Sequence, residues 1–224
     1  MVTGVLADSG LQALVDRLHA ESVAQEAETH GYFTERAKKG ELSWDGLDDD
    51  ANRFMADKMV ALEPLKAEAC YLLCRALRAQ RVVEVGTSFG VSTLYLAAAV
   101  RDNGGGAVIG TEYEPAKAAA ARANFAEAGL AEFIDLREGD LRETLKVVRG
   151  PVDFVLMDIW TEMARPAIEL IAPHLRPGAV VVADNTEQVR HAYGRFFEFV
   201  EDPANRLRSL TLPFDGGLEL VVKV

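Results

Sequence analysis

The first third of the chain shows apolar residues at helical spacing. Leu11, Leu14 and Leu18 recur three or four positions apart, and Asp8 or Ser9 precedes them as a candidate N-cap. Because this periodicity is typical of a helix with one buried face, we expect the N-terminal region to be helical. Further helices are expected over residues 50–60 and 64–77.

From residue 81 onward, short apolar segments alternate with longer amphipathic ones, a pattern typical of strands separated by helices. Connections of that length let neighbouring strands run parallel, with helices on both faces of the sheet. The strands are expected over residues 82–85, 107–112, 132–137, 153–158 and 179–184. The helices between and after them are expected over residues 91–99, 115–128, 165–174 and 188–200.

The last part of the chain breaks this alternation. Residues 207–212 and 218–224 are strand-like and are joined by a link too short for a helix, so they predict an antiparallel pair. The predicted fold is α/β: a doubly wound, Rossmann-like sheet, mostly parallel, with an antiparallel strand from the C-terminal hairpin. We expect residues 1–62 to form a helical cap region and residues 63–224 to form a single compact unit.

Composition narrows the classes of function. Apolar residues make up 49% of the chain and charged residues 26%, which is ordinary for a globular protein. The net charge of −11 argues against partners that carry negative charge, both nucleic acids and membrane surfaces. We see neither a secretory signal nor an apolar run of about 20 residues. Cys70 and Cys74 are expected to be small buried residues in a reducing compartment, so we expect a cytoplasmic protein.

The first predicted strand runs into a glycine-containing turn. Gly86 and Gly90 form a G-x-x-x-G pattern, whereas a dinucleotide site requires three glycines as G-x-G-x-x-G. Glu84 stands just before the turn and would repel a diphosphate but not a cationic ligand. Glu112 ends the second strand, where an acid accepts hydrogen bonds from ribose hydroxyls. The pattern favours a sugar-bearing ligand without phosphates.

Polar residues also end the fourth and fifth predicted strands. Asp158 follows one strand, and Asp184 and Asn185 follow the next. Neighbouring strands lie about 4.8 Å apart, so these side chains are expected to meet at one edge of the sheet. An all-oxygen donor set suits Mg²⁺ or Ca²⁺. The alternative is that these residues only end strands and begin turns.

The glycine turn and the acid after the second strand resemble the class I S-adenosylmethionine-dependent methyltransferases, whose motif is E-x-G-x-x-x-G followed by such an acid. The resemblance covers residues 56–224 and is greatest to the catechol and caffeoyl-CoA O-methyltransferases. It implies S-adenosylmethionine as the cofactor. The positions that match cofactor-binding residues are Leu62, Glu84, Gly86, Thr87, Ser88, Gly90, Ser92, Glu112, Tyr113, Gly139, Asp140, Leu141, Asp158 and Trp160.

In the same family, the positions of Asp158, Asp184 and Asn185 hold a divalent metal, which implies Mg²⁺ or another divalent cation. Such a metal would activate the acceptor hydroxyl. The family usually places a lysine, as general base, where this chain has Thr161, and threonine has no accessible titration. Either the metal alone activates the acceptor, or another group does so, or the metal is absent. The candidate catalytic residues are Asp158 and His191.

The first interpretation is an O-methyltransferase for a hydroxyl of a small, aromatic acceptor, with or without a divalent metal. The alternatives are a metal-independent methyltransferase for another small molecule, a nicotinamide (NAD)-dependent dehydrogenase, and a binding-only module that keeps the cofactor. Dimers are common in the resembling family, so a homodimer is expected. Residues that could line an apolar acceptor pocket, or belong to the core instead, are Trp44, Phe54, Met55 and Met59.

Overall fold

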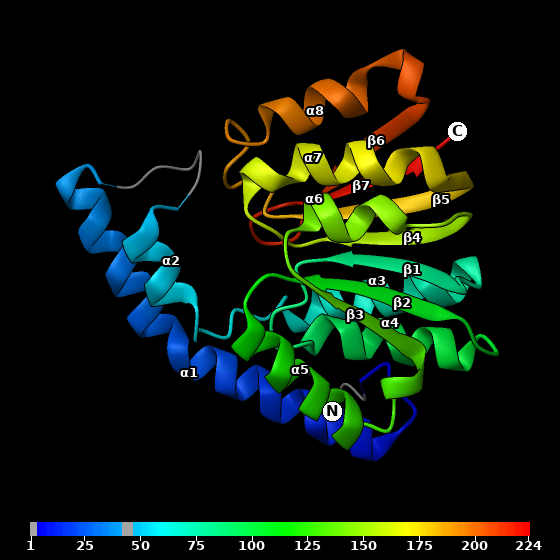
Figure 1. Ribbon diagram of the computed structural model, residues 1–224, viewed down its shortest axis with the longest axis horizontal. Helices are drawn as coiled ribbons and strands as arrows, with labels where there is room; N and C mark the ends of the chain where they lie inside the picture. The colour runs from blue at the N-terminus through cyan, green and yellow to red at the C-terminus, as the bar shows by residue number, and fades with distance from the viewer. Residues whose placement is uncertain (1–3, 42–46) are drawn as a thin grey trace.

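The computed structural model describes residues 4–41 and 47–224. Within them the strands form one seven-stranded sheet of order β3-β2-β1-β4-β5-β7-β6 (Figure 1). The five strands from β1 to β5 pair in parallel, and β7 pairs antiparallel with both β5 and β6. Their bounds are Arg81–Val85 (β1), Ala107–Glu112 (β2), Ile134–Glu138 (β3), Val152–Met157 (β4), Leu175–Asp184 (β5), Leu207–Leu212 (β6) and Leu218–Lys223 (β7). The predicted doubly wound α/β fold with an antiparallel C-terminal hairpin is confirmed.

Helices cover both faces of this sheet. The α-helices are Ser9–Lys39 (α1), Asp49–Met55 (α2), Pro64–Leu77 (α3), Val91–Asp102 (α4), Pro115–Glu127 (α5), Leu141–Thr144 (α6), Thr161–Ile171 (α7) and Gly194–Glu201 (α8). One buried cluster joins the first half of α1, α3, α4 and α5 to the sheet, and a second joins α6, α7 and α8 to the other face. No described helix is both long and apolar enough to cross a membrane.

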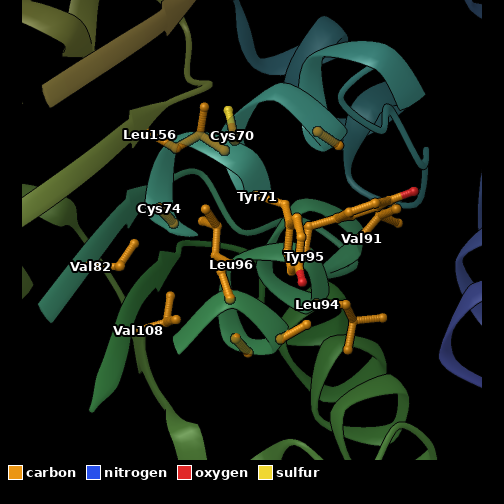
Figure 2. Packing of buried hydrophobic residues seen from close by; sticks show 14 of the residues in the cluster. Cys70, Tyr71, Cys74, Val82, Val91, Leu94, Tyr95, Leu96, Val108 and Leu156 are labelled. Atoms are coloured by element: carbon orange, nitrogen blue, oxygen red, sulfur yellow. The ribbon is translucent and has the colours of Figure 1, made fainter. Parts of the chain in front are cut away.

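Successive residues of a strand pack alternately into the two buried clusters, one on each face of the sheet. Val82 belongs to the cluster with α3 and α4, whereas Val83 belongs to the cluster with α7. Figure 2 shows the first of these clusters, in which Val82 and Val108 from the strands lie near Cys74 of α3 and Leu96 of α4. Because side chains alternate across a strand, Glu84 is directed to the same face as Val82, among buried residues.

The long helix α1 begins in the core and ends outside it. The carboxylate of Asp8 caps its N-terminus by accepting hydrogen bonds from the amides of Gly10 and Leu11, and Leu14 and Leu18 are buried. The second half of the helix extends beyond the sheet, with α2 beside it (Figure 1). The two helices therefore form an arm next to the strand ends.

Two predicted helices are shorter than expected because tertiary contacts hold the chain in other conformations. The helix expected over 50–60 ends at Met55, and the amide of Met59 donates to the Gln25 side chain of α1. The helix expected over 188–200 begins only at Gly194. The residues before it form turns, in which the amides of Glu187 and Gln188 donate to the carbonyl of Gly216.

Candidate active site

A cavity of about 1230 Å³ lies at the carboxyl ends of the parallel strands. Its wall includes residues that end or directly follow four of them: Gly86 after β1, Glu112 of β2, Asp158 after β4 and Asp184 of β5. The chain winds from β1 towards β3 on one side and from β4 onward on the other. Ligands of open α/β sheets bind at such a switch point.

The two glycines of the turn are required by close packing of the chain. Gly86 has φ +93°, and a Cβ there would overlap with the carbonyl oxygen of Asp158. Gly90 has φ +83° at the N-terminus of α4, and a Cβ there would overlap with the ring of Phe125. Gly86 lines the cavity, whereas Gly90 packs behind it. The expectation that both glycines face a ligand therefore receives geometric support only at Gly86.

Glu84 supports the turn from beneath. Its side chain is fully buried, is not part of the cavity wall, and accepts hydrogen bonds from the hydroxyls of Thr87 (3.0 Å), Ser92 (2.7 Å) and Thr93. Burial raises the pKa of Glu84 to about 7, although the three hydroxyl donors oppose this change. Thr87 and Ser92 do line the cavity, so Glu84 acts on the site through them.

Glu112 connects the turn after β1 with the end of β2. One carboxylate oxygen accepts a hydrogen bond from the amide of Ser88 at 2.7 Å, and the other accepts one from the amide of Glu114 at 2.8 Å. These two donors fix the carboxylate on the cavity wall. Each oxygen keeps a lone pair, so the group can still accept hydrogen bonds from a ligand.

Most of the predicted cofactor-binding positions come together on this wall. The ones that line the cavity are Leu62, Gly86, Thr87, Ser88, Ser92, Glu112, Tyr113, Gly139, Asp140, Leu141, Asp158 and Trp160. Asp140 also caps α6 by accepting a hydrogen bond from the amide of Arg142. Glu84 and Gly90 do not reach the cavity, for the packing reasons given above.

The N-terminal arm contributes apolar side chains to a second part of the wall, beside polar ones such as Glu26 and His30. It includes Val23 and Phe33 of α1, Met55 of α2 and Met59. Phe54 does not line the cavity; its ring stacks on Tyr32 with centroids 3.8 Å apart. Trp44 lies outside the described residues.

Of the three residues expected to bind a metal, Asp184 is paired with a lysine. The Lys66 ammonium lies 2.7 Å from Asp184 Oδ1, and the Lys66 side chain is fully buried. Asp184 Oδ2 accepts a hydrogen bond from the side-chain amide of Asn185 at 3.0 Å. The side-chain carbonyl oxygen of Asn185 lies against Gly216, where a Cβ would overlap with it. A hydrogen-bond donor therefore faces each oxygen of Asp184.

This donor set does not fit a divalent cation. Mg²⁺ and Ca²⁺ require several oxygens directed at one point, whereas Asp184 faces an ammonium and Asn185 directs its carbonyl elsewhere. Among the described residues, no group of three or more His, Cys, Asp or Glu side chains is placed to hold a metal ion. The geometry thus departs from the expected triad of Asp158, Asp184 and Asn185.

The pKa values of two acids, Asp158 and Asp184, depend on burial and on the nearby charge of Lys66. Burial raises the pKa of Asp158, and the nearby carboxyls of Asp184 and Glu84 raise it further, whereas Lys66 lowers it. Burial also raises the pKa of Asp184, against the hydrogen bond and charge of Lys66. The ammonium of Lys66 therefore favours the charged forms of both aspartates.

Two residues, Lys66 and His191, have positions that differ from what the sequence predicted. Lys66 was missed, although a lysine on the same helical face as Cys70 and Cys74 is a signal of a buried charge with a partner. His191 was expected at the start of a helix facing the cleft. It is instead exposed in the turns before α8 and is not among the residues that line the cavity.

Comparison with known proteins agrees with this geometry. The family described as a methyltransferase domain matches residues 83–186. A catechol O-methyltransferase from Mycobacterium tuberculosis is 35% identical over 127 residues, which cover 56% of this chain and 57% of that protein. One from Niastella koreensis is 32% identical over 134 residues, which cover 56% and 58%. The chain thus matches somewhat more than half the length of these relatives.

Among solved structures, cofactor-bound Rv0187 from MTB superposes with a TM-score of 0.68 at 28% identity, over 77% of this chain and 86% of that one. The fold, the site and these relatives make the chain similar to the class I S-adenosylmethionine-dependent methyltransferases. Within that class it is similar to the catechol O-methyltransferases. The family match gives no support to the dehydrogenase alternative.

Proposed function

We propose that this protein is an S-adenosylmethionine-dependent O-methyltransferase that acts on a hydroxyl of a small, aromatic acceptor. The observation that carries the proposal is Glu112, whose carboxylate is fixed by the amides of Ser88 and Glu114 on the wall of the cavity. A carboxylate held at the end of the second strand suits the paired hydroxyls of a ribose. The methyltransferase family match and the catechol O-methyltransferase relatives support the same activity.

The proposed cofactor site extends from Glu112 along the glycine turn. Bound S-adenosylmethionine supplies a methyl group on a positively charged sulfur. Ser92 and the backbone of Leu62 are proposed to hold its carboxylate, and Tyr113 and residues 139–141 to lie along the adenine. The carboxylate of Glu112 on this wall favours a cation in the cavity over an anion.

The proposed acceptor site is the part of the wall where the arm contributes apolar side chains. Met55, Met59 and Phe33 present side chains that pack well on an aromatic ring. The reaction forms a carbon–oxygen bond, breaks the carbon–sulfur bond and releases the hydroxyl proton. We assign acceptance of that proton to Asp158, which lines the cavity at the end of β4, rather than to His191, which does not line it.

Calorimetry with S-adenosylhomocysteine tests the cofactor site, because the product binds without turnover. We expect a single saturable site in the wild-type protein. A panel of catechols and other phenols, followed by release of S-adenosylhomocysteine, then tests the reaction. Absence of binding would overturn the proposal as a whole, and binding without turnover would favour the binding-only alternative.

The organisation of the chain is also part of the proposal. Residues 1–62 would form a cap that supplies the acceptor wall, and residues 63–224 the unit that binds the cofactor. A homodimer is proposed from the resemblance alone, and sedimentation velocity would test it. The two free, buried cysteines support a cytoplasmic location.

A further inference from the structure

Among the described residues outside the proposed machinery, Lys66 is the most deeply buried charged group. It is in the first turn of α3, and its side chain has no exposed surface. It is not part of the cavity wall, so it reaches the site only through Asp184. Burying a lysine costs several kcal/mol unless a carboxylate compensates for the lost water. Asp184, 2.7 Å from the Lys66 nitrogen, is the buried partner that offsets this cost.

The Lys66 ammonium occupies a lone pair of the Asp184 carboxylate that a metal ion would need. Asp184 Oδ1 is 2.7 Å from the Lys66 nitrogen, and Glu63 lies 3.5 Å from the same nitrogen. A divalent cation bound to Asp184 would have to displace the ammonium or stand beside a second positive charge in a buried site. Either arrangement is unfavourable, because like charges a few ångströms apart repel strongly away from water.

Two further observations agree with an exclusion of metal. The second oxygen of Asp184 already accepts from Asn185, whose side-chain carbonyl lies against Gly216. The chain also has Thr161 at the position where the resembling family has a lysine. The positive charge near the ends of β4 and β5 is thus Lys66 of α3, and not a lysine at position 161.

We propose that Lys66 is a built-in cation that takes the place of the divalent metal at Asp184, so that this protein is a metal-independent methyltransferase. Lys66 is a positioning residue: its contact with Asp184 Oδ1 at 2.7 Å holds that side chain in place on the cavity wall, and Lys66 itself does not line the cavity. This inference rests on the proposed function only where it concerns turnover. The exclusion of metal is a property of the protein alone and can be measured without any substrate.

Binding of Mn²⁺ provides that measurement. Free Mn²⁺ is titrated against the wild-type protein and against Asp184→Asn, with S-adenosylhomocysteine present, and followed by electron paramagnetic resonance. We expect the two proteins to bind Mn²⁺ equally weakly, through surface acids only. A wild-type site that binds Mn²⁺ at least tenfold more tightly than the variant would overturn the proposal, whereas a merely structural Lys66 would leave such a site intact.

The ion pair itself is tested by thermal unfolding. Lys66→Met should lower the Tm because it leaves the Asp184 carboxylate buried without a partner. Adding Asp184→Asn should restore a large part of that loss. If both single variants unfold at the wild-type Tm, the pair is not formed and the proposal is wrong. If Lys66→Met does not fold, the Mn²⁺ titration of the wild type still decides.

Turnover in EDTA separates this inference from the proposed function. We expect unchanged rates with EDTA and with added Mg²⁺. Loss of turnover in EDTA that Mg²⁺ restores would overturn the built-in cation and leave the methyltransferase intact. Failure to bind S-adenosylhomocysteine would overturn the proposed function, while the Mn²⁺ result would still decide on the cation.

Discussion

The carboxylate of Glu112 at the end of β2 accepts a hydrogen bond from the backbone amide of Ser88 in the turn after β1, at 2.7 Å. The acid that is proposed to hold the ribose is thus attached to the turn that is proposed to hold the methionine part. Because the same carboxylate also accepts from Glu114, its orientation does not depend on a ligand. The two halves of the proposed cofactor site are pre-organised relative to each other.

Replacing Glu112 should weaken binding of S-adenosylhomocysteine. We expect Glu112→Ala to raise the Kd about tenfold to a hundredfold, corresponding to ~1.5–3 kcal/mol for hydrogen bonds to a charged group. Calorimetry measures this change. Glu138→Ala is the matched control, because this acid ends the neighbouring strand β3 and does not line the cavity. Equal affinities of Glu112→Ala and wild type would remove the ribose assignment.

Gly86 should be intolerant of a side chain for a steric reason beyond its φ angle. Its φ is +93°, and a Cβ there would overlap with the carbonyl oxygen of Asp158. Left-handed backbone costs a non-glycine residue about 1–2 kcal/mol. Gly86→Ala should therefore lower the free energy of unfolding by more than this amount and also weaken binding of S-adenosylhomocysteine, because the turn must move. Chemical denaturation and calorimetry measure the two effects.

Gly104 supplies the matched control for this prediction. It has nearly the same φ, +95°, but a Cβ there would meet no atom within 4 Å. Gly104→Ala should show only the cost of the backbone conformation and leave cofactor binding unchanged. If both variants lose the same stability, the close approach of Gly86 to the end of β4 has no energetic consequence.

The strands and their order of appearance were predictable because each is a local pattern of apolar residues. The helix expected over 50–60 was not, because the bonds that end it are made by residues far away in sequence. Met59 donates to Gln25, and Ser22 both donates to the carbonyl of Met59 and accepts from the amide of Ala61. Helical periodicity in the segment itself contains no information about such partners.

In the candidate site, too, the sequence predicted positions that follow from local pattern but not contacts between distant segments. Glu112 and Asp158 were predictable because polar residues at strand ends meet at one edge of a parallel sheet. The pairing of Lys66 with Asp184 was not, because it joins α3 to β5 across 118 positions. Glu84 was singled out by the glycine motif, but its partners place it beneath the turn instead of on the cavity surface.

Glu84 should make the protein without ligand less stable as the pH rises from about 4.5 to about 7. Its pKa is about 7 in the folded protein and 4.5 as the reference value, so the folded state keeps the proton that the unfolded state loses. Its contribution to stability is therefore fully present below pH 4.5 and lost as the pH passes 7. The difference corresponds to about 3 kcal/mol at 1.36 kcal/mol per pKa unit.

Denaturation curves between pH 4.5 and 8 for the wild type and Glu84→Gln measure this contribution. The variant cannot ionise at position 84, so its stability should fall less with pH than that of the wild type. Asp184 also has a raised pKa and is present in both proteins, so its effect cancels in the difference. The raised pKa of Asp158 is partly due to Glu84, so it falls in the variant and changes the pH dependence in the same direction. A difference that stays constant across this range would contradict the raised pKa of Glu84.

The two candidate catalytic residues should respond in opposite ways. Asp158 lines the cavity and is proposed to accept the acceptor's proton, so Asp158→Asn should lower kcat about a hundredfold or more, in the range of general-base catalysis. His191 is exposed and does not line the cavity, so His191→Ala should leave kcat and KM close to wild-type values. Steady-state rates with the best acceptor of the phenol panel measure both variants. Calorimetry with S-adenosylhomocysteine shows whether each still binds cofactor. A large loss of kcat in His191→Ala with cofactor binding intact would mean that the turns before α8 close onto the acceptor during the reaction, and the proton acceptor would then be the imidazole.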